Sequence, residues 1–357
     1  MVPYDRIFRE IDLQNPVVDI DDPVQYYNET LLGQLCTNRV SSAAYHRMCT
    51  NQQDFRKIPR EFLKTLEALH EINLKRTEDF LENLSCLADM FKDADFTHAF
   101  LKGSFLTPRL YPRGVRTSND IDILVEQKDI SRCQRILTDN GFIQGGIQGN
   151  TLVPSSRSEI INSRMNFGET IPFRKRKEGQ FISVDINFSL DFKPSGNNET
   201  ISKLLSSATR VAIDESRYLH TLEPTNFLIH LCCHLYKEAT TYHWVRYRRD
   251  LMLYKFVDIC VFFDAFASES FFAELSRRII ELGSEEECYY TFENTTVIFP
   301  RIKALPGFEA LMATIKPSNL DFMRQVVSPG DKRVFWNDMN FTDWFFCEDR
   351  ISELREV

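Results

Sequence analysis

The segment that most constrains the fold is the alternating run NDIDILV at residues 119–125. Side chains of a β-strand alternate between its two faces, so Asp120 and Asp122 point the same way while Ile121 and Ile123 point into a core. From the rise per residue of a strand, the two acidic residues lie roughly 7 Å apart along the chain. Two carboxylates at this spacing can hold one or two divalent cations, and Mg²⁺ prefers such oxygen ligands.

An Asp-x-Asp sequence alone is weak evidence, because such a pair at a strand end often meets only solvent. Upstream of it, an apolar run ends at Gly103-Ser104. A glycine after a buried strand lets the backbone approach a ligand closely. Ser104 offers a hydroxyl and a backbone N–H to a phosphate. The two parts together favour a site that holds both a metal ion and a phosphate group.

This combination resembles the nucleotidyltransferase superfamily, which has the polymerase-β-like fold. Its signature is a hydrophobic residue, Gly, Gly or Ser, a spacer, and Asp-x-Asp on the next strand, matched here by KGS at residues 102–104 and DID at 120–122. The longer run looks similar to the bacterial uncharacterised nucleotidyltransferase family, with Tyr111-Pro112 and Arg116 inside the spacer. The resemblance covers roughly residues 96–192. Its fifteen-residue spacer is longer than in many superfamily members, and a proline-containing loop can absorb the difference.

A second strand is predicted at residues 181–192, where FISVDINFSLDF alternates without a break. Asp185 and Asp191 share its polar face. The resemblance implies a third carboxylate on a later strand beside the Asp-x-Asp strand, and alternation cannot choose between the two. Asp185 ranks first because it lies in mid-strand, where neighbours hold it in place. Asp191 ranks second because it lies roughly 20 Å further along, just before Lys193-Pro194 ends the strand.

The expected fold class is α+β: a nucleotidyltransferase-type mixed β-sheet with flanking helices, plus a helical domain. We expect an N-terminal helical segment at 1–92, the catalytic core at 93–195 and a mainly helical domain at 196–357. We also expect helices at 24–36, 59–75, 77–92, 269–283 and 286–297, strands at 96–101 and 120–125, and a helix after Asp129 that ends at Asn140-Gly141. The basic segment 154–179 is interpreted either as a solvated hairpin tip or as a loop that meets a phosphate or an acidic acceptor.

Composition limits the partners and the compartment. The chain has 43 basic and 51 acidic residues, a net charge of −8, which argues against nucleic acid as the acceptor. It contains no run of 18 apolar residues, so we expect no membrane segment. The first residues are charged and lack a signal-peptide core, which predicts a cytoplasmic protein. The nine cysteines are scattered without CxxC pairs, as expected for reduced thiols.

A helix expected after Pro224 places His230 and His234 on one face at i, i+4. That spacing can ligate zinc, but no Glu follows the first histidine, so the HExxH pattern is absent. The pair is interpreted either as packed near the cleft or, together with Arg249, as a contact to the acceptor or the triphosphate.

The resemblance implies two-metal phosphoryl transfer, in which paired cations clamp the attacking and leaving oxygens. Asp120, Asp122 and Asp185 would hold two Mg²⁺ ions, with Mn²⁺ as a substitute. Nucleotide binding is assigned to four residues: Gly103 and Ser104 at the phosphates, and Lys102 and Arg116 against the triphosphate charge.

The implied reaction moves a nucleoside monophosphate from an NTP, such as ATP, to a hydroxyl on a small molecule, peptide or protein. One alternative is another group transfer on the same metal site, such as glycosyl transfer from a nucleotide-sugar. A second alternative is a non-catalytic nucleotide-binding module. The sequence identifies neither the base nor the acceptor.

Overall fold

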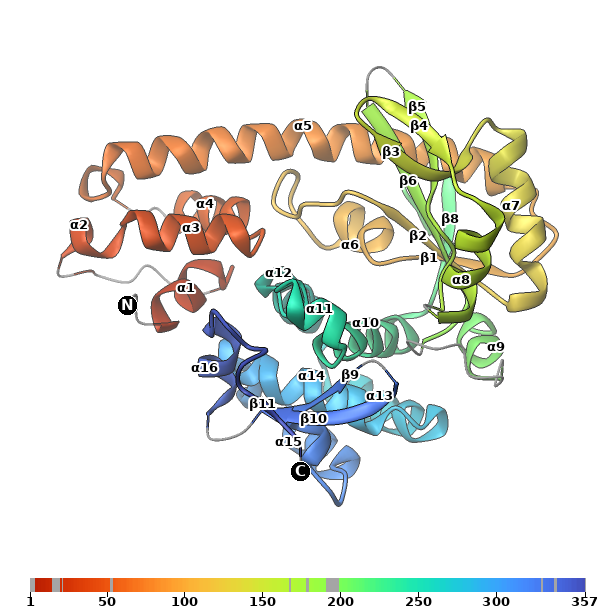
Figure 1. The fold of residues 1–357 in the computed structure, drawn as a ribbon. Coiled ribbons are helices and arrows are strands. Elements are labelled where there is room, and N and C mark those ends of the chain that lie inside the picture. The colour runs from red at the N-terminus through yellow and green to blue at the C-terminus, as the bar shows by residue number, and fades with distance from the viewer. Residues whose placement is uncertain are drawn as a thin grey trace.

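The computed structural model describes residues 4–14, 20, 22–51, 54–166, 168–177, 180–190, 199–328, 330–336 and 339–356. A mixed sheet lies at one side of the molecule, and one long helix connects it to the N-terminal helices (Figure 1). The C-terminal helices pack below both (Figure 1). This arrangement confirms the α+β class with flanking helices and a mainly helical region.

The central sheet has the strand order β1-β2-β6-β5-β3-β4. Its strands are β1 (His98–Leu101), β2 (Ile121–Val125), β3 (Ile143–Gln148), β4 (Thr151–Pro154), β5 (Phe173–Lys177) and β6 (Gln180–Asn187). Strands β2 and β6 run parallel, whereas the other neighbours are antiparallel. The strands predicted at 96–101 and 120–125 are confirmed to within two residues. The predicted strand at 181–192 ends earlier, at Asn187, and residues 191–198 lie outside the described part.

Both faces of β1 and β2 are covered, which is why every residue of these strands is buried. Ile121 and Ile123 pack with the second half of the long helix and with α7 (Ile130–Asp139). Leu124 belongs to the larger core shared with the helical regions. The sheet is therefore packed between two hydrophobic cores, and the polar side chains of these strands lie at one end of the sheet.

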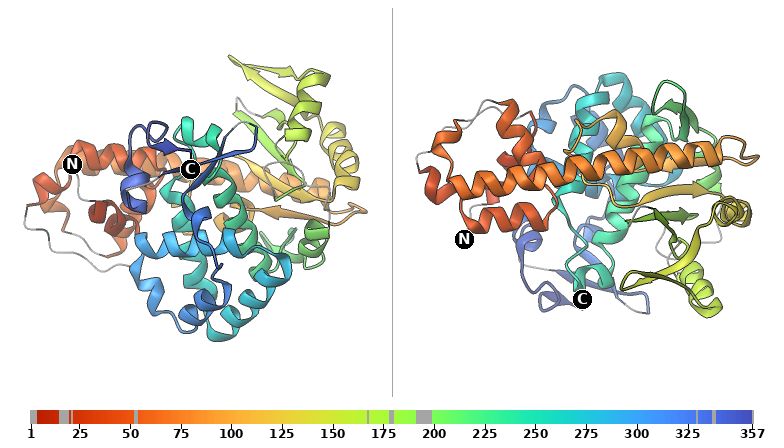
Figure 2. Two further views of the ribbon diagram at one scale, coloured as in Figure 1. Left: turned by 60° about the horizontal axis from the view of Figure 1, so that its bottom comes forward. Right: turned by 90° about the horizontal axis from the view of Figure 1, so that it is seen from above.

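The long helix α5 (Arg60–Phe91) is continuous, so the prediction of two helices at 59–75 and 77–92 is wrong. Neither Gly nor Pro interrupts it, and the hydroxyl of Thr77 donates to the carbonyl of Asn73 at 2.8 Å. Its 32 residues make a rod of about 48 Å. Seen from above, the rod runs from the N-terminal helices to the sheet (Figure 2).

The N-terminal region is built from short helices. They are α1 (Tyr4–Ile11), α2 (Pro23–Tyr26), α3 (Glu29–Thr37), α4 (Ser41–Thr50) and the 3₁₀ turn η1 (Phe55–Lys57). The single helix predicted at 24–36 is in fact two, because Asn28 leaves the helical conformation. Its side chain caps α3 by accepting from the backbone N–H of Leu31 at 2.9 Å.

The hairpin predicted within 154–179 is confirmed in part, because β5 forms an antiparallel hairpin with β6. The helix α8 (Arg157–Asn166), which precedes β5, was not predicted. The helix predicted after Asp129 is confirmed as α7, preceded by the 3₁₀ turn η2 (Gln127–Asp129), and Gly141 adopts φ 82° just beyond its end.

The C-terminal region is mainly helical. Its helices are α9 (Glu199–Leu205), α10 (Pro224–Ala239), α11 (Tyr242–Arg246), α12 (Leu253–Phe266), α13 (Glu269–Leu282), α14 (Glu285–Ile298), η3 (Pro300–Ala304), α15 (Phe308–Ile315), η4 (Asp321–Arg324) and α16 (Phe341–Phe346). The helices predicted at 269–283 and 286–297 are thus confirmed. The region also holds two small sheets, formed by β7 (Thr209–Ala212) with β8 (Tyr218–Thr221), and by β9 (Gln325–Ser328), β10 (Lys332–Trp336) and β11 (Leu354–Arg355).

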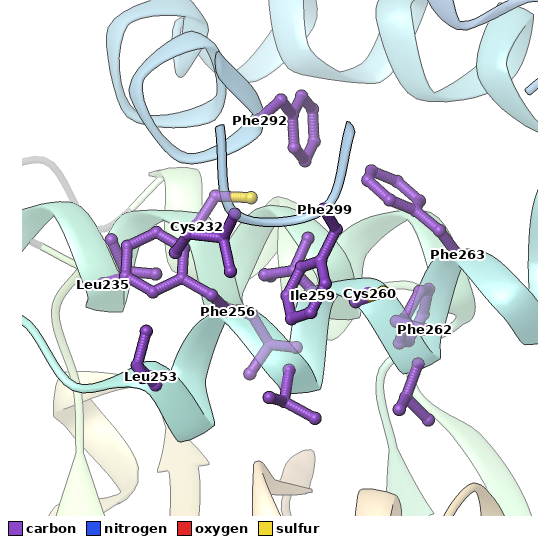
Figure 3. Packing of buried hydrophobic residues seen from close by; sticks show 14 of the residues in the cluster. Cys232, Leu235, Leu253, Phe256, Ile259, Cys260, Phe262, Phe263, Phe292 and Phe299 are labelled. Atoms are coloured by element: carbon purple, nitrogen blue, oxygen red, sulfur yellow. The ribbon is translucent and has the colours of Figure 1, made fainter. Parts of the chain in front are cut away.

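Aromatic side chains form much of this core. Phe256, Phe262 and Phe263 of α12 are fully buried, and Figure 3 shows Phe256 beside Leu235 of α10 and Phe263 facing Phe292 of α14. Helices α10 and α12 are thereby held rigidly side by side. Among the described helices, none is long and apolar enough to cross a membrane.

Candidate active site

Most of the predicted site residues line one cavity of about 300 Å³. The cavity lies where the sheet meets α10 and α12. The predicted residues in its wall are Lys102, Gly103, Arg116, Asp120, Asp122, Asp185, His234 and Arg249. Ser104 and His230 are not among the lining residues. The wall also contains residues that the sequence did not single out: Arg39, Glu169, Glu238, Trp244, Tyr254, Lys255 and Asp258.

Three carboxylates come together at the sheet end of the cavity. Asp122 is the register partner of Asp185 across the parallel β2–β6 pair. Asp122 is buried, with 3% of its surface exposed, Asp185 is half-buried, and Asp120 is exposed. Asp191, the second candidate for the third carboxylate, lies outside the described residues.

Asp122 is held by two donors. Its Oδ1 accepts from Lys102 Nζ at 2.8 Å and from Asn187 Nδ2 at 3.1 Å. Lys102 has a φ of 49°, a conformation that costs energy for a residue with a side chain. This backbone conformation lies at the junction of β1 and α6 (Gly103–Arg109). The ammonium thus occupies one oxygen of a carboxylate predicted to bind a cation.

Asp185 contrasts with Asp122, because its Oδ1 is buried without a hydrogen-bond partner among the described residues. Burial raises the pKa of Asp185 well above its usual value, and the neighbouring charges of Asp122 and Asp120 raise it further. Glu169 adds a fourth acid, next to Asn187 through a β-bridge. Burial is the main factor that raises its pKa, and Asp122 adds to the effect.

Arg116 is already neutralised, contrary to its predicted role against the triphosphate. Its Nε and Nη2 donate to the two oxygens of Asp258 on α12 at 2.8 and 2.9 Å. The hydroxyl of Tyr111 donates to the same carboxylate at 2.8 Å. The remaining nitrogen, Nη1, donates to Ser118 Oγ at 2.6 Å. Arg116 therefore fixes the loop before β2 onto the helical region.

Close packing around Gly103 explains why the motif has a glycine at this position. A Cβ on Gly103 would lie 2.7 Å from Ser118 Oγ and 2.8 Å from Arg116 Nη1. Glycine is needed there because the loop approaches closely, whereas the prediction invoked collision with phosphates. The Ser104 side chain is buried, and its Oγ has no hydrogen-bond partner in the described structure.

The predicted histidine pair stacks along α10, with ring centroids 6.5 Å apart and ring planes 4° from parallel. Burial lowers the pKa of His230 to about 3 and that of His234 well below its usual value. Both rings are therefore neutral at pH 7. His234 Nε2 lies 3.5 Å from Glu238 Oε2 and faces the cavity.

The ionic groups of the cavity divide into paired and unpaired sets. The paired cations are Lys102 with Asp122, Arg116 with Asp258, and Lys255 with Glu238. Among described residues, the side chains of Asp120, Glu169 and Asp185 have neither a hydrogen-bond nor an ion-pair partner. The same holds for the guanidinium groups of Arg39 and Arg249. Unpaired charges of both signs therefore line one cavity.

Arg39 is a cation of the cavity that sequence reasoning missed and that, unlike Lys255, has no ion-pair partner among the described residues. It lies between α3 and α4 with a φ of 57°, and its guanidinium is 5.7 Å from the ring centre of Tyr254. The preceding Asn38 anchors this turn, because its Oδ1 accepts from the backbone N–H of Leu253 at 3.2 Å. No local pattern marks a contact between residues more than 200 positions apart.

The mixed sheet, with a glycine after its first strand and an acid pair on the next, defines a nucleotidyltransferase-like protein. A family model described as uncharacterised nucleotidyltransferase matches residues 28–300, and the chain belongs to this family. Among solved structures, it is similar to an antigenic nucleotidyltransferase-like protein from Paracoccidioides brasiliensis, at 14% identity and a TM-score of 0.33. That match covers 58% of this chain and 91% of the other. Comparison with curated proteins gave no match.

Proposed function

We propose that this protein transfers a nucleoside monophosphate from an NTP to a hydroxyl group, with Mg²⁺ as cofactor and pyrophosphate as the second product. The observation that carries the proposal is the set of unpaired charges in the cavity. Among the described residues, the side chains of Asp120, Glu169 and Asp185 have no hydrogen-bond or ion-pair partner, and neither do the guanidinium groups of Arg39 and Arg249. A magnesium–nucleotide complex supplies cations for the first group and phosphate oxygens for the second.

The carboxylates of the cavity are suitable ligands for Mg²⁺. Carboxylate oxygens are the ligands that Mg²⁺ prefers, and the buried Oδ1 of Asp185 has no partner among the described residues. In the described part of the chain, no group of three or more His, Cys, Asp or Glu side chains is arranged so that it could hold a metal ion. Lys102 holds Asp122 instead. Asp120, Asp122 and Asp185 would hold Mg²⁺, which when bound stabilises the charge that develops on the phosphoryl group.

In the proposed step, the acceptor oxygen bonds to the α-phosphorus while the bond from that phosphorus to the bridging oxygen breaks. Pyrophosphate leaves with the electron pair of that bond. Asp185 takes the proton of the acceptor hydroxyl as the general base. Arg39 and Arg249 bind the phosphates of the leaving group.

Two measurements test the proposal. In a thermal-shift panel, an NTP with Mg²⁺ should raise the melting temperature more than the same NTP with EDTA, and more than nucleotide-sugars with Mg²⁺. With ATP labelled on either the α- or the γ-phosphate, only the α-label should appear in an acceptor. Transfer of the γ-label, or a sugar found by mass spectrometry, would contradict the proposal.

A further inference from the structure

A second, larger cavity of about 660 Å³ adjoins the site cavity. The two cavities share Arg39 and the loop residues 117–119 that lead into β2. The second cavity, called here the α5 groove, lies between α5 and the first residues of β6. A molecule in the groove therefore reaches Asp120 directly past Asn119.

One wall of the α5 groove is an unpaired strand edge. Strand β2 pairs with β6 only from Val184 onward, so Gln180–Ser183 extend past it. On their other side, these four residues pair with Arg174–Lys177 of β5. In an antiparallel ladder, alternate residues direct their N–H and C=O groups to opposite sides. Part of this backbone therefore faces the groove over about 13 Å, without a strand partner among the described residues.

The opposite wall is one face of α5, on which Arg76 and Asp79 are the charged lining residues, and Arg39 adds a second cation to the groove. Asp79 is the acid of the groove, and it already accepts from Gln180 Nε2 at 2.8 Å. The guanidinium groups of Arg39 and Arg76 have neither a hydrogen-bond nor an ion-pair partner in the described structure. The groove thus combines open backbone groups with two free cations.

We propose that the α5 groove binds an extended, acidic polypeptide segment, which adds as a strand to Gln180–Ser183. The inference rests on the proposed function, since the segment supplies the acceptor. Its Ser, Thr or Tyr oxygen would form the new bond to the α-phosphorus, with pyrophosphate leaving and the hydroxyl proton passing to Asp185. Strand addition supplies affinity through main-chain hydrogen bonds, and the guanidinium of Arg76 selects an acidic residue, because Arg39 is assigned to the nucleotide phosphates.

The test uses the full chain and an array of octapeptides with one fixed Ser and random flanking positions. Acidic residues should be enriched and proline depleted among the bound peptides. The tightest-binding peptide is then labelled with fluorescein and methylated at alternate backbone nitrogens. Its Kd should rise about tenfold, because hydrogen bonds to the strand are lost. Binding that shows no acidic preference, or that ignores N-methylation, would overturn the proposal.

Matched variants locate the peptide. Ile72 lines the groove with 51% of its surface exposed, and Ile280 on α13 has the same exposure outside it. Ile72→Trp should raise the peptide Kd about tenfold, whereas Ile280→Trp should not change it. Arg76→Glu should also weaken binding, whereas Lys64→Glu on the same helix should not. If both Ile72→Trp and Arg76→Glu bind the peptide as tightly as wild type, the proposal is wrong.

Calorimetry with Mg–ATP separates the two proposals. Ile72→Trp should leave the Kd for Mg–ATP unchanged; if that Kd rises instead, the groove holds the nucleoside and the peptide assignment is wrong. If wild-type protein binds the peptide but none of the four Mg–NTP complexes, the proposed function fails while the groove remains a peptide site.

Discussion

Asp122 and Asp185 lie side by side as register partners of the parallel β2–β6 pair, yet only Asp122 has a cationic partner. Their side chains share a face because register partners in neighbouring strands point the same way. Lys102 balances one charge, and Asp185 is left with a raised pKa. Asp185 therefore lines the cavity without an ion-pair partner among the described residues.

The first prediction concerns Asp122→Ala. Asp122 is buried and holds Lys102, so the substitution leaves an ammonium without a partner. We expect a loss of about 2 to 3 kcal/mol in the free energy of unfolding, measured with urea, because Lys102 is partly solvated. Transfer should fall roughly a thousandfold. An unchanged rate that still requires Mg²⁺ would remove Asp122 from the metal site.

The double variant Asp122→Ala/Lys102→Met separates the two effects. Removing both charges should restore most of the lost stability, because no charge is left unpaired. Activity should stay lost, since the ligand is still absent. If activity returns with stability, Asp122 acts only through the fold.

The second prediction concerns Asp185→Asn. Without Mg²⁺, this variant should be as stable as wild type or slightly more stable, because a repelling carboxylate is removed. It should lose most of the Mg²⁺-induced rise in melting temperature and nearly all activity. Asp191→Asn serves as the control and should behave like wild type. An exchange of the two behaviours would move the third carboxylate to Asp191.

The third prediction concerns the two unpaired guanidinium groups. Arg39→Gln and Arg249→Gln should each weaken Mg–ATP binding by about ten- to a hundredfold in calorimetry, because each removes a charge-assisted hydrogen bond. The melting temperature should not change, since both side chains are exposed. Arg246→Gln, on α11 outside the cavity, is the matched control. Equal losses in all three would indicate a general charge effect.

Local patterns were sufficient to predict the strands that carry the acids. Alternation over 119–125 located β2 and the face that Asp120 and Asp122 share. The alternation at 181–192 located β6, and its middle position favoured Asp185, which the structure places beside Asp122. These inferences depend only on residues that are neighbours in the chain.

Contacts between residues that are far apart in the chain could not be predicted from the sequence. Arg116 was assigned to the triphosphate because it follows a motif, but Asp258, 142 positions away, holds it. Glu169 joins the acids through a β-bridge to Asn187 that has no sequence signature. Helix α5 was predicted as two helices divided at residue 76, although neither Gly nor Pro interrupts it.

The fourth prediction tests the close approach at Gly103. Gly103→Ala should lower the melting temperature and weaken Mg–ATP binding together, because the new Cβ displaces Ser118 and Arg116. Adding Ser118→Ala removes the nearest atom and should recover part of both losses. If the melting temperature recovers in the double variant but Mg–ATP binding does not, the Cβ acts on the nucleotide itself.

The last prediction is a pH dependence of stability that arises at His98, outside the candidate site. Its Nδ1 lies 3.1 Å from the carbonyl oxygen of Phe96, and burial lowers the pKa of His98 to about 4. The unfolded chain has a histidine pKa of about 6.5 and therefore binds more protons than the folded chain between pH 6.5 and 4. Stability falls as the pH falls through this window.

Replacing His98 with glutamine should remove this contribution. Between pH 7 and 4.5, His98→Gln should lose about 2 to 3 kcal/mol less unfolding free energy than wild type, as measured by urea denaturation at both values. His243→Gln, at an exposed histidine, is the control and should keep the wild-type pH dependence. If His98→Gln loses as much stability as wild type, the imidazole is already protonated in the fold, and the acid sensitivity arises from other groups.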